Sequence, residues 1–175
     1  LAFWIISNNL FMLYKKKFGR SIGMIIAHFG VGLLILGITG SSIWQKEKIV
    51  NMKINNKIYM NKYKIVFDSI NEIKGPNYVA LRANFLVYNN KKSVVTTLKP
   101  ENRFYPITGN FTSEASIHTN LLRDLYIVLG EGNTANGWTV RIYNNPLVIW
   151  IWIGALIIFL GGLVSIKQNL NKLTK

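Results

Sequence analysis

The sequence contains no cysteine, only two histidines and only seven acidic residues among its 175 positions. Without cysteine the chain offers no disulfide bond and no thiolate ligand, which excludes a structural zinc site built from its own cysteines and histidines. The seven carboxylates are scattered rather than clustered, so nothing supports a pair acting as general acid and base. These absences argue against a self-contained catalytic or metal site.

Charge is missing altogether from two long stretches, although the whole chain carries 21 Lys and Arg residues and a net charge of +14. Neither Ile22 to Trp44 nor Pro146 to Ile166 contains a charged residue. Each is close to the ~20 residues that cross the ~30 Å hydrocarbon core as a helix. A buried helix of a soluble protein seldom stays apolar on every side for this length. We therefore predict a membrane protein with transmembrane helices at 22–44 and 146–166.

Basic residues flank the outer ends of both predicted spans, namely Lys15, Lys16, Lys17, Arg20, Lys167, Lys172 and Lys175. The positive-inside rule places both termini on the side from which the membrane is loaded, and the segment between the spans on the other side. Tryptophans at the inner ends suit the headgroup level: Trp44, Trp150 and Trp152. Segment 167–175 is then a basic tail. Residues 1–21 form an apolar segment with a basic flank, either a surface helix or the end of a span.

Between the spans the pattern changes to short alternating runs rich in Val, Ile, Tyr and Phe, separated by the turn-forming groups NN, GPN and EGNTANG. We predict an all-β domain over 45–145, a sandwich or a partly closed barrel. Asn89 and Asn90 indicate a hairpin turn. The apolar residues of the segment TSEASIHTNLLRD fit neither the alternation of a strand nor the spacing of a helix well, and we interpret the segment as a short helix.

Other motifs in the predicted β domain carry little functional weight. His118 lies near Ser116 and Asp124 in the sequence, and we interpret it as a surface histidine. GEGNTANG lacks the spacing of a dinucleotide-binding loop and suits a hairpin loop. The lysines are spread along the strands without a stacking motif, so we expect no nucleic-acid partner.

His28 stands out because it lies inside the first predicted span, where an ionisable side chain is costly and usually functional. At helical steps of three and four its face reads Ser21, Ile25, His28, Gly32, Ile35 and Thr39. We expect Gly32 to leave room for a flat macrocycle beside the imidazole. Further glycines would let neighbouring helices approach closely: Gly23, Gly30, Gly37 and Gly40. From the residues alone, four roles stay open for His28: a hydrogen bond between helices, haem ligation, other metal ligation and proton transfer.

The segment SIGMIIAHFGVGLLILGITGSS resembles the part of CcmF proteins that carries one transmembrane histidine. CcmF is the haem lyase subunit of system I cytochrome c maturation. The similarity continues in the family's order through GPNYVALRANF, LKPENRFYPITGNFTSEASI, LLRDLYIVLGE and GWTVRIYNNPLVIWIWIGALIIFLGGLVS. It covers most of Arg20 to Ile166, and the chain resembles only the C-terminal part of the family.

The resemblance implies that His28 is an axial ligand of a haem b, and hence a ligand of the haem iron. The second ligand of that haem would lie on an earlier helix, in a partner chain. No catalytic residue is implied. CcmF proteins are longer and carry a tryptophan-rich WWD segment flanked by histidines, which this sequence does not contain. We therefore expect a split protein whose partners are the other CcmF fragments, a haem chaperone and apocytochrome c.

We expect the chain to be one subunit of a haem lyase, and not a complete catalyst alone. The assembled lyase would join haem to the thiols of a Cys-x-x-Cys-His segment in apocytochrome c. The Ile, Asn, Lys, Phe and Tyr bias suits an AT-rich organellar gene. It points to the mitochondrial inner membrane, with the β domain in the intermembrane space and both termini in the matrix. A bacterial inner membrane with a periplasmic β domain is the alternative.

A second interpretation is a non-catalytic anchor or assembly subunit in which His28 is only structural. Polar residues in the parts most similar to the family are expected to form buried structural pairs rather than to contact haem propionates: Arg103, Glu114, Arg123, Asp124 and Tyr126.

Overall fold

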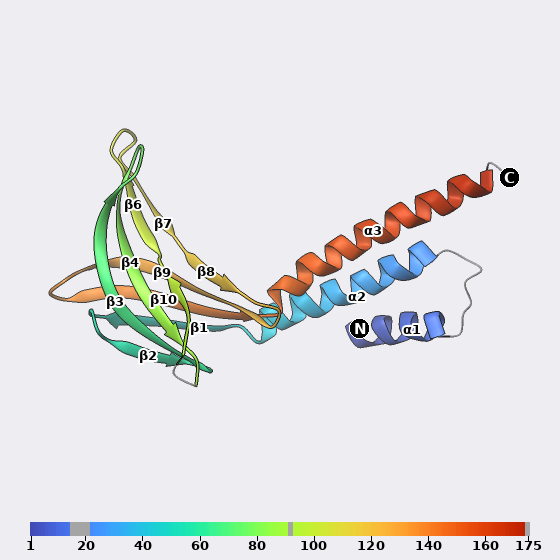
Figure 1. The fold of residues 1–175 in the computed structure, drawn as a ribbon, viewed down its shortest axis with the longest axis horizontal. Helices are drawn as coiled ribbons and strands as arrows, with labels where there is room; N and C mark the ends of the chain where they lie inside the picture. The colour runs from blue at the N-terminus through green and yellow to red at the C-terminus, as the bar shows by residue number, and fades with distance from the viewer. Residues whose placement is uncertain (15–21, 91–92, 174–175) are drawn as a thin grey trace. The chain divides into compact units, whose positions relative to one another are not determined.

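The computed structural model describes residues 1–14, 22–90 and 93–173, which form three helices and ten strands. The helices are α1 (Ala2–Tyr14), α2 (Ile22–Ile43) and α3 (Val148–Leu173). The strands are β1 (Lys46–Met52), β2 (Lys57–Met60), β3 (Tyr63–Lys74), β4 (Val79–Tyr88), β5 (Val94–Leu98), β6 (Glu101–Tyr105), β7 (Asn110–Glu114), β8 (Ser116–Thr119), β9 (Arg123–Asn133) and β10 (Gly137–Pro146). All strands lie between α2 and α3 in the sequence, as predicted (Figure 1).

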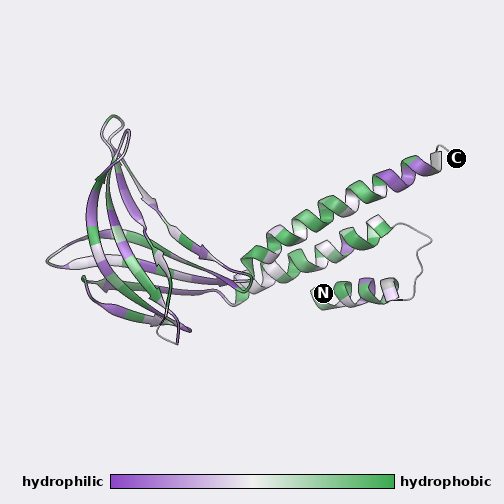
Figure 2. Ribbon diagram, in the orientation of Figure 1, coloured by the Kyte–Doolittle hydropathy of each residue, from purple (hydrophilic) through white to green (hydrophobic). Residues whose placement is uncertain are grey.

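The chain divides into two compact units. The helical unit comprises Leu1–Gln45, Asn120–Arg123 and Asn145–Lys175, and the sandwich unit comprises Lys46–Thr119 and Asp124–Asn144. Two helices are long and apolar enough to cross a membrane, Ile22–Ile43 and Val148–Asn171. Figure 2 shows hydrophobic residues along both of them and hydrophilic residues toward the C-terminal end of α3. The predicted fold class, two membrane-capable helices around an all-β domain, is confirmed.

The sandwich unit contains two antiparallel sheets. One has the strand order β1-β10-β9-β8, and the other has the order β2-β3-β4-β6-β7 with β5 paired to β4. Asn89 and Asn90 lie where β4 turns back into β5, and the backbone N–H of Asn89 donates to the carbonyl oxygen of Ser93. The predicted hairpin is therefore confirmed.

The core of the sandwich is formed by the alternate residues of each central strand, because successive side chains on a strand point to opposite faces. On β3 and β4, Phe67 and Phe85 are fully buried and stack with ring centroids 4.6 Å apart. The facing sheet contributes a matching set of buried side chains: Leu125, Ile127, Leu129, Val140 and Ile142.

The segment interpreted as a short helix is extended instead, and that interpretation is wrong. It forms β7 and β8, and the chain passes from one sheet to the other at position 115. All five residues of β7 are exposed, so this edge strand has no buried face to impose an alternating pattern. Its sequence therefore lacked the strand signal.

Glycines allow close packing of α2 against α3 in the helical unit, as predicted. A Cβ placed on Gly30 would lie 2.8 Å from the carbonyl oxygen of Gly154, and one placed on Gly154 would lie 2.6 Å from the amide nitrogen of Leu34. Gly23 faces Gly161, whereas Gly37 faces Ile151, so the two helices run antiparallel. In membranes, small residues at such positions let backbones approach and gain van der Waals contact.

The helix bounds differ slightly from the expected spans. Helix α3 starts at Val148 because Pro146 still belongs to β10, and Leu147 between them adopts a left-handed φ of 61°. The helix then continues to Leu173, so most of the expected basic tail is helical. Lys15 to Arg20, the expected basic flank of the first span, lie outside the described residues.

Candidate functional site

His28 lies on a face of α2 that the rest of the described helical unit leaves exposed. Met24, Ile38 and Thr39 are exposed on the same helix, whereas Gly30 and Gly37 are buried against α3. The Nδ1 atom of His28 lies 2.8 Å from the carbonyl oxygen of Met24, one turn earlier. A carbonyl only accepts, so Nδ1 carries a proton, and in the neutral imidazole Nε2 then keeps its lone pair. A hydrogen bond of this kind fixes the tautomer and orients the ring.

Gly32 does not leave the open space that the sequence suggested. A Cβ placed on Gly32 would lie 2.7 Å from Cγ1 of Ile6, so α1 occupies this position (Figure 1). The N-terminal apolar segment is thus a helix alongside α2, and Gly32 makes room for that helix. A planar group at His28 would instead lie on the uncovered face of α2, where Met24 is exposed one turn earlier.

A cluster of charged side chains lies across β4, β6 and β7, with Glu101 at its centre. Its Oε1 accepts hydrogen bonds from Nε and Nη2 of Arg82, both at 2.6 Å, and its Oε2 accepts one from Nε of Arg103 at 2.8 Å. Nη1 of Arg103 lies 3.7 Å from Oε1 of Glu114. The guanidinium of Arg103 also lies over the ring of Tyr78, 4.6 Å from the ring centroid. We call these residues the Glu101 cluster.

The Glu101 cluster is electrostatically satisfied. Burial on its own raises the pKa of Glu101, but the hydrogen bonds and positive charges of Arg103 and Arg82 outweigh burial and lower it below its ordinary value. The bond to Glu101 raises the pKa of Arg103. A carboxylate held in its charged form between two guanidinium groups is a poor general acid or base. The cluster is therefore structural. Arg103 forms the kind of pair that the sequence predicted, whereas the Glu114 side chain is 47% exposed and its contact with Arg103 is not a buried pair. Glu101 and Arg82 were missed.

The residues of the RDLY motif lie in the other sheet. Asp124 pairs with Thr119 across β8 and β9, and its Oδ1 is buried without a hydrogen-bond partner among the described residues. Tyr126 stacks on Tyr143 of β10 with ring centroids 4.9 Å apart. His118 is half-buried on β8 opposite Leu125. Within the described part of the chain, no group of three or more His, Cys, Asp or Glu side chains is placed to hold a metal ion.

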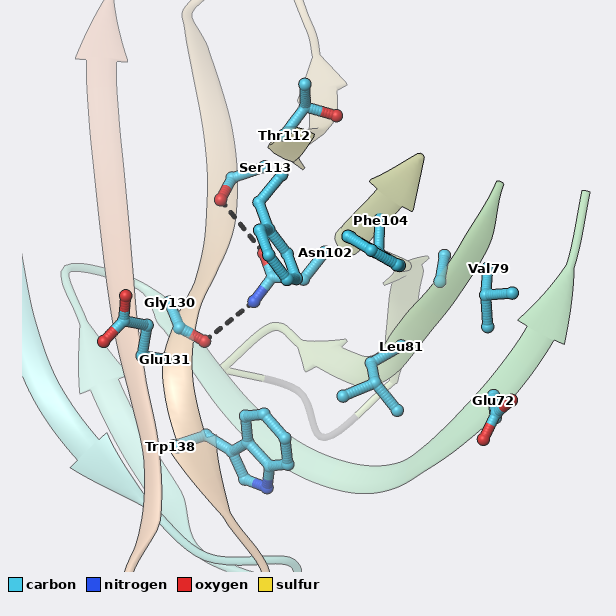
Figure 3. A pocket seen from close by; sticks show the side chains of 13 residues that line it. Glu72, Val79, Leu81, Asn102, Phe104, Thr112, Ser113, Gly130, Glu131 and Trp138 are labelled. Carbon is cyan, nitrogen blue, oxygen red and sulfur yellow. Dashed lines mark hydrogen bonds between the residues drawn. The ribbon is translucent and has the colours of Figure 1, made fainter. Parts of the chain in front are cut away.

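An open cavity of about 690 Å³ lies in the sandwich unit, lined by residues of both sheets (Figure 3). Its walls are mostly apolar, with side chains from β4, β6, β7 and β10: Val79, Leu81, Phe104, Phe111 and Trp138. Asn102 connects the two sheets there, because its Nδ2 donates to the carbonyl oxygen of Gly130 at 2.9 Å. Its Oδ1 accepts from the hydroxyl of Ser113 at 3.0 Å.

The chemistry of this cavity suits binding and not catalysis. Its charged lining residues are two exposed glutamates, Glu72 and Glu131, and it contains no histidine, cysteine or lysine. The hydroxyl of Ser113 is engaged with Asn102, so no base activates it as a nucleophile. This cavity could not be predicted from the sequence, because its lining comes from six separate strands.

Comparison with known families identifies the chain. The family model for the CcmF C-terminal beta-sandwich matches residues 43–146, more than half of the sequence. The chain belongs to the CcmF family. Curated CcmF proteins described as "Cytochrome c-type biogenesis protein CcmF" are similar over most of the chain. The protein from Haemophilus influenzae is 36% identical over 169 residues, and the protein from Escherichia coli K12 is 37% identical over 144 residues.

The similarity covers nearly all of this chain but only a part of its relatives. The two alignments include 94% and 82% of the chain, and 26% and 22% of the respective CcmF proteins. A solved structure titled "Cytochrome c Heme Lyase CcmF" superimposes with a TM-score of 0.66 over 82% of this chain and 24% of that one. At 20% sequence identity this likeness supports the shared fold. The chain thus spans about a quarter of the length of the CcmF proteins it matches.

Proposed function

We propose that this CcmF-family chain is a subunit of a cytochrome c haem lyase and that His28 supplies one axial ligand of an internal haem b. The observation that carries the proposal is the geometry of His28. Its Nδ1 is engaged with the Met24 carbonyl at 2.8 Å, and its ring lies on a face of α2 that α1 and α3 leave uncovered. Nε2 of a neutral imidazole in this setting is a good ligand for haem iron.

The described residues fit one axial position of such a haem and not both. The sequence has two histidines, and His118 lies in the sandwich unit, so we infer that the second ligand comes from outside these 175 residues. Met24, exposed one turn before His28, offers apolar contact to a macrocycle. A haem held in this way supplies one-electron chemistry, which would keep the haem to be attached in its reduced state.

For the sandwich unit we infer a docking role near the site of haem attachment. The apolar cavity has the lining of a binding surface, and the unit contains no catalytic arrangement among its described residues. The partners of the complex would be the remaining CcmF fragments, a haem chaperone and apocytochrome c. We place the complex in the mitochondrial inner membrane, although the curated relatives named above are bacterial.

The test is the reduced-minus-oxidised absorption spectrum of the detergent-purified complex, with matched substitutions of the chain's two histidines. His28→Ala should abolish or shift the b-type haem band, because the iron loses an axial ligand. His118→Ala should leave the band unchanged, since His118 lies in the sandwich unit. An unchanged band in assembled His28→Ala complex, or no haem in the intact complex, would refute the ligand assignment and favour an anchor or assembly subunit.

A further inference from the structure

The loop Asn120–Arg123, which connects β8 to β9 and includes the first residue of β9, belongs to the helical unit, although the rest of both strands belongs to the sandwich unit. The side chain of Asn120 fixes its shape. Its Oδ1 accepts hydrogen bonds from the backbone N–H groups of Leu122 at 2.9 Å and Arg123 at 3.0 Å. The backbone N–H of Asn120 donates to the carbonyl oxygen of Arg123 at 3.1 Å. Asparagine stabilises such a turn by imitating a backbone hydrogen bond.

Two further hydrogen bonds join this turn to the beginning of α3. The indole Nε1–H of Trp150 donates to the carbonyl oxygen of Leu121 at 2.7 Å. The backbone N–H of Leu147 donates to the carbonyl oxygen of Leu122 at 3.0 Å. The loop is therefore held at the level of the first turn of a helix that is apolar enough to span a membrane. That level is the lipid headgroup region, where tryptophan side chains are enriched.

The turn presents two adjacent leucines outward. The exposed fractions are 64% for Leu121 and 63% for Leu122, although their backbone carbonyls are engaged. Other large apolar side chains at the same ends of α2 and α3 are exposed too: Ile43, Trp44 and Trp152. From Asn144 to Ile166 the sequence has no charged residue. Leaving a leucine in water instead of an apolar medium costs about 1.5–3 kcal/mol, so an aqueous position for both is unfavourable.

We propose that the loop Asn120–Arg123 is a membrane anchor whose two leucines enter the boundary between headgroups and acyl chains in the leaflet where α3 begins. The partner is the lipid surface, because the hydrogen bonds to Leu147 and Trp150 fix the loop at that depth. Because the turn is already held by hydrogen bonds, burying its leucines in the membrane costs little conformational entropy. The anchor acts independently of any haem ligand.

The absence of cysteine makes this inference directly testable by site-directed spin labelling. The 175-residue chain would be reconstituted in nanodiscs of phosphatidylcholine and phosphatidylglycerol, with one nitroxide at Leu122→Cys. Matched labels at Ile107→Cys, 90% exposed after β6, and Leu156→Cys, 58% exposed within α3, mark water and acyl chains. The measurement is the accessibility of each nitroxide to oxygen, which concentrates in acyl chains, relative to a water-soluble nickel complex.

The ratio of oxygen to nickel accessibility at position 122 should exceed that at position 107 severalfold and lie below that at position 156. A ratio equal to that at position 107 would place the loop in water and overturn the proposal. A label shielded from both reagents would show protein cover and would also overturn it. Trp150→Phe removes the donor to Leu121 but keeps an aromatic ring, so it should increase the mobility of the label at position 122 and not at position 107. Unchanged mobility at position 122 would contradict the fixed depth.

Discussion

Glu101→Gln should destabilise the sandwich unit more than any other single loss of charge in the Glu101 cluster. The substitution keeps the shape of the side chain but removes the charge that both Arg82 and Arg103 contact at 2.6 to 2.8 Å. It also directs an amide N–H₂ group toward one guanidinium, which has no acceptor to offer. The perturbation therefore tests whether this cluster fixes β4 against β6.

The magnitude follows from burial. Hydrogen bonds to charged groups contribute about 1.5–3 kcal/mol each, and breaking a fully buried pair costs about 3–5 kcal/mol. The Glu101 side chain is 8% exposed, but those of Arg82 and Arg103 are 38% and 27% exposed, so water compensates part of the loss. We expect a decrease of about 2 kcal/mol in the free energy of unfolding, or about 1 M in the urea midpoint.

The assay is urea unfolding of the full chain in detergent micelles, followed by near-ultraviolet circular dichroism at several pH values. The folded-state pKa of Glu101 is lowered, so its stabilisation is fully present above the ordinary value of 4.5 and is lost as the pH falls through the folded-state value. The difference in the free energy of unfolding between the unmodified chain and Glu101→Gln should therefore be largest near neutral pH and should shrink below pH 4.5.

Glu114→Gln is the matched control, because its carboxylate is 47% exposed and lies 3.7 Å from Arg103. It should change stability by less than about 0.5 kcal/mol. Equal effects of the two substitutions, or a Glu101→Gln effect that does not depend on pH, would refute the reasoning.

Two packing predictions can be tested with matched positions. Gly30→Leu places a side chain where a Cβ already lies 2.8 Å from the carbonyl oxygen of Gly154, so it should cost about 1–3 kcal/mol of helix packing and lower the thermal midpoint of the helical circular dichroism. Gly162→Leu should not lower this midpoint, because a Cβ at Gly162 meets nothing within 4 Å. Equal thermal midpoints of the two variants would contradict the close packing of α2 against α3. Phe85→Ala empties a fully buried position and should cost about 3–5 kcal/mol in urea unfolding. Phe111→Ala, at a residue 77% exposed, should have little effect, and a similar loss from both would argue against the assigned core.

Local patterns account for the parts of the fold that the sequence predicted. The run from Ile22 to Ile43 has no charge and needs no partner to be recognised as a span. Strands β4 and β9 alternate because one face of each is buried, and Asn89 and Asn90 mark the turn after β4. In each case the signal and the structure involve neighbouring residues.

The remainder depends on contacts between distant segments. Gly32 gave no sign that Ile6 would pack on it, since that contact depends on how α1 lies along α2. Asn120 was interpreted as part of a short helix. Its loop could not be predicted, because some of the hydrogen bonds that hold the loop come from Trp150 and Leu147, which are distant in the sequence. Glu101 was missed because Arg82 lies on another strand and reaches it only through the register of β4 and β6.

His28 combines the two situations. Its position inside an apolar run made it a candidate functional residue, with a structural hydrogen bond as one of four open roles. The uncovered face could be recognised only once α1 and α3 had been placed on the other faces of α2. The resemblance to CcmF and the geometry are separate arguments. The first suggests haem, and the second shows that Nδ1 is the ring nitrogen engaged with the Met24 carbonyl.

The segment 46–144 should fold without α2 and α3, because its main core residues all lie between Met52 and Ile142 and β1 pairs with β10 along its whole length. Separated from α3, however, the loop leucines lose the bonds from Trp150 and Leu147 and any lipid contact. We expect a cooperative thermal transition by circular dichroism together with self-association in sedimentation velocity. Replacing Leu121 and Leu122 by serine should restore a monomer without lowering the transition temperature. A piece that shows no cooperative transition in either form would mean that the sandwich depends on the helices, whereas persistent association of the serine variant would locate the adhesive surface elsewhere.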